Sequence, residues 1–161
     1  MNNNKKKDIA YSLKEATRKL EGYCAYQDRC HKEVNSKLKE MGMISAAMDE
    51  IVGHLIKENF LNEERFARSF ARGKFNIKKW GKKRIINELK QRDITKYNLK
   101  LALKEIDEDI YLETLEILAK KRAMQLTETN VFKKRKKLAD YLLYRGWESP
   151  LVYEITKRLI P

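Results

Sequence analysis

Apolar residues recur along this chain at helical spacing, and the same arrangement returns after about 50 residues. Leu38, Leu89 and Leu142 align when the chain is divided into three segments, with separations of 51 and 53 residues. Four further columns align with these leucines: Val34, Ile85 and Leu138; Met43, Ile94 and Trp147; Met48, Leu99 and Val152; and Leu55, Ile106 and Leu159. Residues spaced by four and seven share one helical face, so each segment predicts two amphipathic helices. Five columns at constant offsets argue against a chance match to a leucine pattern.

The two helices of each pair are separated by a predicted turn, at Gly42, Asp93 or Gly146. Glycine adopts the left-handed backbone conformation that ends many helices without steric cost, and aspartate tolerates it better than most residues. The second helices are expected to be capped by Ser45, by Thr95 and by Ser149, the last of these before Pro150.

A further helix is predicted ahead of each pair. The first covers about 9–25, with Ile9, Leu13, Ala16 and Leu20 on one side. In the second, Asn62 is expected to cap a helix that carries Phe66, Phe70 and Ala71. The third continues to about Met124, with Ile110, Leu115, Leu118 and Ala119 on its apolar face. The repeating unit is therefore a module of three helices.

Composition supports an all-α fold. The 161 residues include only two prolines and six glycines, and 37% are charged, which is typical of elongated helical arrays with a narrow core. We expect a tandem array of three three-helix modules of about 50 residues each. Residues 1–7 are expected to be a disordered basic tail, and the modules are expected at 8–60, 61–107 and 108–161.

The charge does not follow the repeat. The net charge is +13, and residues 61–107 hold 14 basic and 6 acidic side chains, a net of +8. A field of this size attracts polyanions, so nucleic acid, or an acidic protein surface close to it, is the expected partner. The alternative is a basic surface that serves only solubility.

Two basic clusters are candidate contact sites. Eight cations within seventeen residues of the middle module, with no acidic residue among them in sequence, form the main expected contact patch for a polyanion: Arg68, Arg72, Lys74, Lys78, Lys79, Lys82, Lys83 and Arg84. Phe75 and Trp80 could stack on bases or could simply fill a module junction, and we favour the junction. The secondary basic patch is Lys133, Lys134, Arg135, Lys136 and Lys137, which must encircle its helix.

No catalytic, metal or cofactor site is expected. The chain lacks a phosphate-binding loop and the common hydrolase and zinc-protease motifs. Cys24 and Cys30 are too far apart for a zinc-finger pair, and His31 and His54 add no regular ligand spacing. With no signal peptide and no apolar run approaching a membrane span, we expect a cytoplasmic monomer with free thiols.

Several segments of the chain carry motifs that occur together in one known family. Asn62–Ala67 is similar to its acidic-acidic-x-Arg-Phe-Ala segment, and Gly81–Leu89 followed by Ile94 to its Gly-Pro-x-Arg-Ile-x-x-Glu-Leu…Gly-Ile stretch. Residues 33–42 and 136–147 match the corresponding first- and third-module segments. Over about 15–160 the chain thus resembles the RecX regulators of RecA recombinase, and the resemblance makes RecA and its DNA the expected contacts of the eight-cation patch. Lys82 replaces the usual proline, Asp93 a usual glycine, and Cys30 a common serine cap.

The resemblance implies a curved array of modules that lies in the groove of the RecA–DNA filament. Such a protein would hinder ATP hydrolysis, strand exchange and repressor cleavage by RecA, as part of DNA repair and the SOS response. Its own affinity for nucleic acid is then expected to be weak. The alternative is a stand-alone helical DNA-binding protein that acts without a recombinase.

Overall fold

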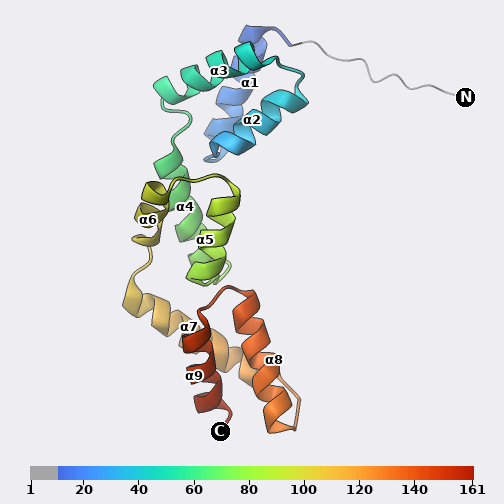
Figure 1. Ribbon diagram of the computed structural model, residues 1–161, viewed down its shortest axis with the longest axis vertical. Helices are drawn as coiled ribbons and strands as arrows, with labels where there is room; N and C mark the ends of the chain where they lie inside the picture. Colours follow the sequence, from blue (N-terminus) through green and yellow to red (C-terminus); the bar gives the residue numbers. More distant parts are fainter. Residues whose placement is uncertain (1–10) are drawn as a thin grey trace, which may run out of the picture. The chain divides into compact units, whose positions relative to one another are not determined.

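The structure is a computed structural model that describes residues 11–161 (Figure 1). This part of the chain forms nine α-helices and no strand, which confirms the all-α prediction. The helices are α1 (Leu13–Tyr26), α2 (His31–Glu40), α3 (Ser45–Lys57), α4 (Glu63–Asn76), α5 (Lys82–Gln91), α6 (Lys96–Leu103), α7 (Glu108–Gln125), α8 (Val131–Tyr144) and α9 (Ser149–Leu159). The predicted tail at 1–7 lies outside the described residues.

The chain divides into two compact units, Met1–Phe66 and Ala67–Pro161. The first contains α1 to α3, and the second contains most of α4 and all of α5 to α9. The order of the helices confirms the three-helix repeat, because each predicted segment holds three of them. The module borders at 60/61 and 107/108 stay a prediction.

In the first unit, α3 packs against both α1 and α2 around one apolar core. The core consists of Ala16, Leu20, Cys24, Val34, Leu38, Met48, Ile51, Leu55 and Leu61. The helix predicted over 9–25 begins later than expected, at Leu13, because Ser12 caps it. The Ser12 hydroxyl accepts from the Glu15 N–H, and the Glu15 carboxylate accepts from the Ser12 N–H, so two free donors are satisfied.

The predicted turns are confirmed, whereas only some of the predicted caps are. Gly42, Asp93 and Gly146 all have positive φ, at 77°, 57° and 90°. The side chains of Asn62 and Thr95 accept hydrogen bonds from the first turns of α4 and α6.

Two of the expected caps are wrong by one residue. Ser45 and Ser149 are the first residues of their helices, and Ile44 and Glu148 occupy the cap positions. Neither Ile44 nor Glu148 caps its helix through its side chain.

In the second unit α7, α8 and α9 pack on one another, and α5 packs on α6. Leu115 and Ala119 of α7 are buried as expected, but Ile110 is 54% exposed and Tyr111 is fully buried in its place. The apolar face of α7 is therefore rotated by about one residue from the expected stripe at its start. The apolar pattern did not predict that Tyr111 is buried, because a tyrosine hydroxyl is polar and the residue is therefore not counted as apolar.

Candidate nucleic-acid interface

The connection between α4 and α5 lies directly against the turn between α8 and α9, within the second unit. The Gly81 N–H donates to the Arg145 carbonyl oxygen at 2.8 Å, and the Lys83 N–H donates to the Gly146 carbonyl oxygen at 3.0 Å. A Cβ atom on Gly81 would overlap the Gly146 carbonyl, and one on Gly146 would overlap Arg84. Two glycines are thus needed for this backbone contact, for a reason unrelated to the helix end that predicted one of them.

Two side chains of the α8–α9 turn hold the α4–α5 connection by its carbonyl groups. Arg145 Nη1 donates to the Lys78 carbonyl oxygen at 2.6 Å, and Trp147 Nε1 donates to the Lys79 carbonyl oxygen at 3.2 Å. Lys79 has a φ of 56°, a conformation that costs a residue with a Cβ atom roughly 1 kcal/mol. The hydrogen bond to its carbonyl and the packing around it fix the lysine backbone in that conformation.

A buried aromatic cluster lies beneath this contact. Tyr111 and Trp147 have ring centroids 4.4 Å apart, and Phe75 lies 5.7 Å from Tyr111 and 6.5 Å from Trp147. Phe75 is 4% exposed. Its ring is therefore not accessible for base stacking here, and it packs against Tyr111 of α7 and Trp147 of the α8–α9 turn.

The Tyr111 hydroxyl links three elements. It accepts from the Lys82 N–H at 2.9 Å and donates to the Glu148 carboxylate at 2.6 Å. Burial, together with the hydrogen bond to Glu148, raises the pKa of Tyr111 above its ordinary value. A proline at position 82 would have no N–H for this bond, so the Lys82 departure from the RecX pattern has a structural consequence.

Three of the predicted contact cations are paired with carboxylates that are distant in sequence. Arg68 and Arg72 lie 2.9 and 3.2 Å from the Glu105 carboxylate, and their hydrogen bonds lower the pKa of Glu105. Lys82 pairs with Glu108. The basic run therefore has acidic neighbours in space although it has none in sequence, because Glu105 of the α6–α7 connection and Glu108 of α7 supply the carboxylates.

Trp80 is a half-buried ring covered by cations. Lys74 Nζ lies 4.9 Å and the Arg84 guanidinium 4.1 Å from its centroid, and Phe70 meets it edge-on. Cation–π contacts of this kind stabilise by about 0.5–1 kcal/mol when exposed. These contacts occupy part of the surface that a stacking base would use.

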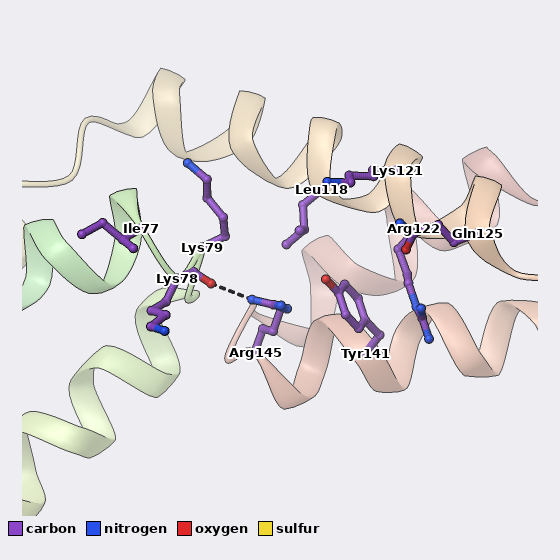
Figure 2. Close-up of a pocket in the computed structure, with 9 residues that line it drawn as sticks. All are labelled: Ile77, Lys78, Lys79, Leu118, Lys121, Arg122, Gln125, Tyr141 and Arg145. Carbon is purple, nitrogen blue, oxygen red and sulfur yellow. Dashed lines mark hydrogen bonds between the residues drawn. The ribbon is translucent and has the colours of Figure 1, made fainter.

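The remaining predicted cations are exposed. Lys78, Lys79 and Lys83 have no ion pair within residues 11–161. Lys78 and Lys79 line a cavity of about 340 Å³ formed with α7 and α8 (Figure 2). Its lining is Ile77, Lys78, Lys79, Leu118, Lys121, Arg122, Gln125, Tyr141 and Arg145.

Lys121, Arg122 and Arg145 were not among the predicted site residues. Lys121 and Arg122 follow Lys120 in a short basic run, which is the one signal in the sequence that could have indicated them. Arg145 stands alone between a tyrosine and a glycine, and only its position in space connects it to Lys78.

The secondary basic patch on α8 is divided by its contacts. Lys136 pairs with Asp140 at 2.7 Å, and Lys137 pairs with Glu128 at 3.1 Å. The Arg135 guanidinium donates to the Ile160 carbonyl oxygen and lies over the Phe132 ring at 5.8 Å. Lys133 and Lys134 have no ion pair in the described part of the chain. The patch therefore leaves fewer unpaired charges than the sequence indicates.

The remaining chemistry of the described region is limited. Between residues 11 and 161 no three histidine, cysteine, aspartate or glutamate side chains gather as a metal site would require, and His54 pairs with Glu21 at 2.8 Å. Cys24 and Cys30 are buried free thiols, and burial raises the pKa of each. None of the nine helices has the length and apolar content needed to cross a bilayer.

These features define a class of all-α proteins that are built from three-helix repeats and carry basic surfaces. Two family models match the chain: "RecX, second three-helix domain" at residues 62–103, and "RecX, third three-helix domain" at residues 108–156. The chain belongs to the RecX family, whose curated members are regulatory proteins.

Individual relatives and solved structures agree with this assignment. The regulatory protein RecX of Clostridioides difficile is 30% identical over 77% of this chain and 58% of its own length. That of Prosthecochloris aestuarii is 27% identical over 86% of this chain and 89% of its own. The crystal structure of RecX from Lactobacillus salivarius has a TM-score of 0.77 at 25% identity and covers 91% of this chain and 96% of its own. The chain spans only about three fifths of the length of several curated RecX proteins that it matches, among them the Clostridioides difficile protein.

Proposed function

We propose that this chain binds the filament that RecA forms on DNA and negatively modulates RecA. The activities reduced would be ATP hydrolysis, strand exchange and cleavage of the SOS repressor. In this role the chain acts as a binding protein without catalysis of its own, as a cytoplasmic monomer, and needs no metal or cofactor. RecX family membership supports RecA as the proposed partner.

The single observation that supports a filament contact is the exposed basic surface beside the α4–α5 connection. The backbone that carries Lys78 and Lys83 is held in place by its hydrogen bonds to the α8–α9 turn. A fixed backbone reduces the entropy lost when a flexible side chain is ordered on binding. The surface is therefore suited to a polyanionic filament.

The test is RecA-catalysed ATP hydrolysis on single-stranded DNA, with this protein added below RecA stoichiometry. We expect a concentration-dependent loss of turnover. The double variant Lys78→Glu/Lys83→Glu should inhibit far less than the parent chain. The matched control Lys100→Glu/Lys104→Glu changes the charge equally, in α6 and at its C-cap, and should retain inhibition. Unchanged ATP hydrolysis with the parent chain would sink the proposal.

A stand-alone DNA-binding role is the second candidate, and the net charge of +13 favours it. It requires tight binding to DNA without RecA, with affinity falling steeply as salt rises; neutralising about six duplex phosphates implies a slope near −5 on logarithmic axes. The filament role requires weaker intrinsic binding and a dependence on assembled RecA. Binding measured with and without RecA separates the two.

A further inference from the structure

We infer that the cavity between the α4–α5 connection, α7 and α8 binds a phosphate group of a nucleic-acid backbone. The inference rests on the proposed function for the choice of nucleic acid as partner, and it adds a defined site and residues from α7 and α8. The site lies entirely within the second unit, so its geometry is that of one compact body.

The charge of the lining carries the argument. Five of its nine residues are cationic and none is acidic: Lys78, Lys79, Lys121, Arg122 and Arg145. None of the five makes an ion pair with a carboxylate of residues 11–161, unlike Arg68, Arg72 and Lys82 near by. Five cations around one cavity repel one another, and a bound anion would offset that repulsion.

Arg122 shows the lack of a negatively charged partner most clearly. Its Nε atom is buried and has no hydrogen-bond acceptor in the described part of the chain. A buried donor on a charged group is costly when it is left without a partner, by roughly 1–3 kcal/mol or more. An anion in the adjoining cavity would provide a countercharge for this guanidinium.

Three of the five cationic groups are also held in position before any ligand arrives. The Arg122 and Arg145 guanidinium groups each lie 4.9 Å from the centroid of the Tyr141 ring. Arg145 is further fixed by its bond to the Lys78 carbonyl oxygen, drawn as a dashed line in Figure 2, and Lys79 Nζ donates to the Asn76 carbonyl oxygen. Groups that are already ordered lose little entropy on binding, which distinguishes this site from a solvated lysine run.

The other lining residues favour a nucleic-acid phosphate over a carboxylate. Ile77, 77% exposed, and Leu118 give the cavity an apolar part beside its cations. A volume of about 340 Å³ accommodates a phosphate together with its sugar. Guanidinium groups match the oxygens of phosphates and carboxylates alike, so the preference for a nucleic acid comes from the sugar, which would contact the apolar part. The competing ligand is an acidic protein segment, and the experiment below distinguishes it from a nucleic acid.

The experiment measures binding of the full chain, without RecA, to two fluorescent probes of equal length: single-stranded oligothymidylate and oligoglutamate. The test variant is Lys78→Gln/Lys121→Gln, because both lysines are exposed and unpaired in residues 11–161, so folding should be unaffected. The matched control is Lys90→Gln/Lys100→Gln, two exposed lysines of α5 and α6 outside the cavity lining. Circular dichroism confirms that each variant is folded.

We expect the test variant to bind oligothymidylate about tenfold more weakly than the control, with a logarithmic salt slope shallower by roughly 0.7, which corresponds to the one single-strand phosphate contact of the cavity. Equal weakening in the test and control variants would show diffuse charge and overturn the site. Selective loss of oligoglutamate binding would also overturn it, in favour of an acidic protein ligand. If the parent chain did not inhibit RecA while the test variant still showed the selective loss of oligothymidylate binding, only the proposed function would be contradicted.

Discussion

The backbone N–H of Gly81 donates a hydrogen bond of 2.8 Å to the backbone carbonyl oxygen of Arg145. This contact joins the start of α5 to the end of α8, and it brings the cations of two helical modules to one surface. Arg145 in turn donates to the Lys78 carbonyl oxygen, so the two segments hold each other at both ends of the connection. The cavity between the α4–α5 connection, α7 and α8 depends on this arrangement.

Gly81→Ala should therefore destabilise the second unit. The added methyl group would overlap the Gly146 carbonyl, and relieving the overlap must separate the backbones, at a cost of roughly 2–4 kcal/mol. Urea unfolding followed by circular dichroism measures the change. The control is Gly73→Ala in the middle of α4, where a Cβ meets nothing within 4 Å and should stabilise by about 1 kcal/mol. Equal stability of the two variants would contradict the close approach.

Tyr111→Phe should also lower the free energy of unfolding, by about 1–3 kcal/mol, because it leaves the Lys82 N–H and the Glu148 carboxylate without their shared partner. The same urea assay applies. Tyr153→Phe is the control, since Tyr153 is 58% exposed, and it should change stability by less than about 0.5 kcal/mol. If Tyr111→Phe left the free energy of unfolding unchanged, water would have to replace the hydroxyl as the partner of the Lys82 N–H and the Glu148 carboxylate.

Acid should weaken the tie between α7 and α9. The Arg158 guanidinium, followed by Lys120, lowers the pKa of Glu116 from 4.5 to about 2. A carboxyl whose pKa is lower in the folded state contributes stability above about pH 4.5, and that contribution is lost as pH falls toward 2. Arg158 is more than half exposed, so the contribution should stay below about 1 kcal/mol.

Glu116→Gln is expected to flatten the fall in stability between pH 5 and pH 2, measured by urea unfolding at each pH. Glu113→Gln, an exposed position one turn earlier without an ion pair in residues 11–161, should leave that dependence unchanged. An identical pH profile for Glu116→Gln and the parent chain would exclude the pair as a source of stability.

The two thiols should be slow to react in the folded protein. Cys24 is 5% exposed and Cys30 fully buried, and burial raises the pKa of both, so little thiolate is present at pH 8. We expect modification by a chromogenic disulfide reagent to be many times slower in buffer than in guanidinium chloride. Rapid reaction of both thiols in buffer would contradict the described packing of α1 and α2.

The local elements of this protein could be predicted from its sequence. Leu38, Leu89 and Leu142 are all fully buried, and the glycine and aspartate turns have the expected left-handed backbone. Helical periodicity and turn chemistry act over a few neighbouring residues, so they are legible in one stretch of chain. The predicted caps at Ser45 and Ser149 were wrong by one residue, because a shift of one residue in a helix start leaves the apolar pattern unchanged.

The surface was decided only by the tertiary structure. The middle segment carries a net of +8, but Glu105 and Glu108 neutralise three of its eight candidate cations from beyond the run. Conversely, Arg145 meets Lys78 across 67 residues, and Arg122 lies in the same cavity lining. The sequence by itself determined the helices, the repeat and the sign of the charge. Which cations are paired and which converge depends on contacts between distant segments, and no local pattern encodes those.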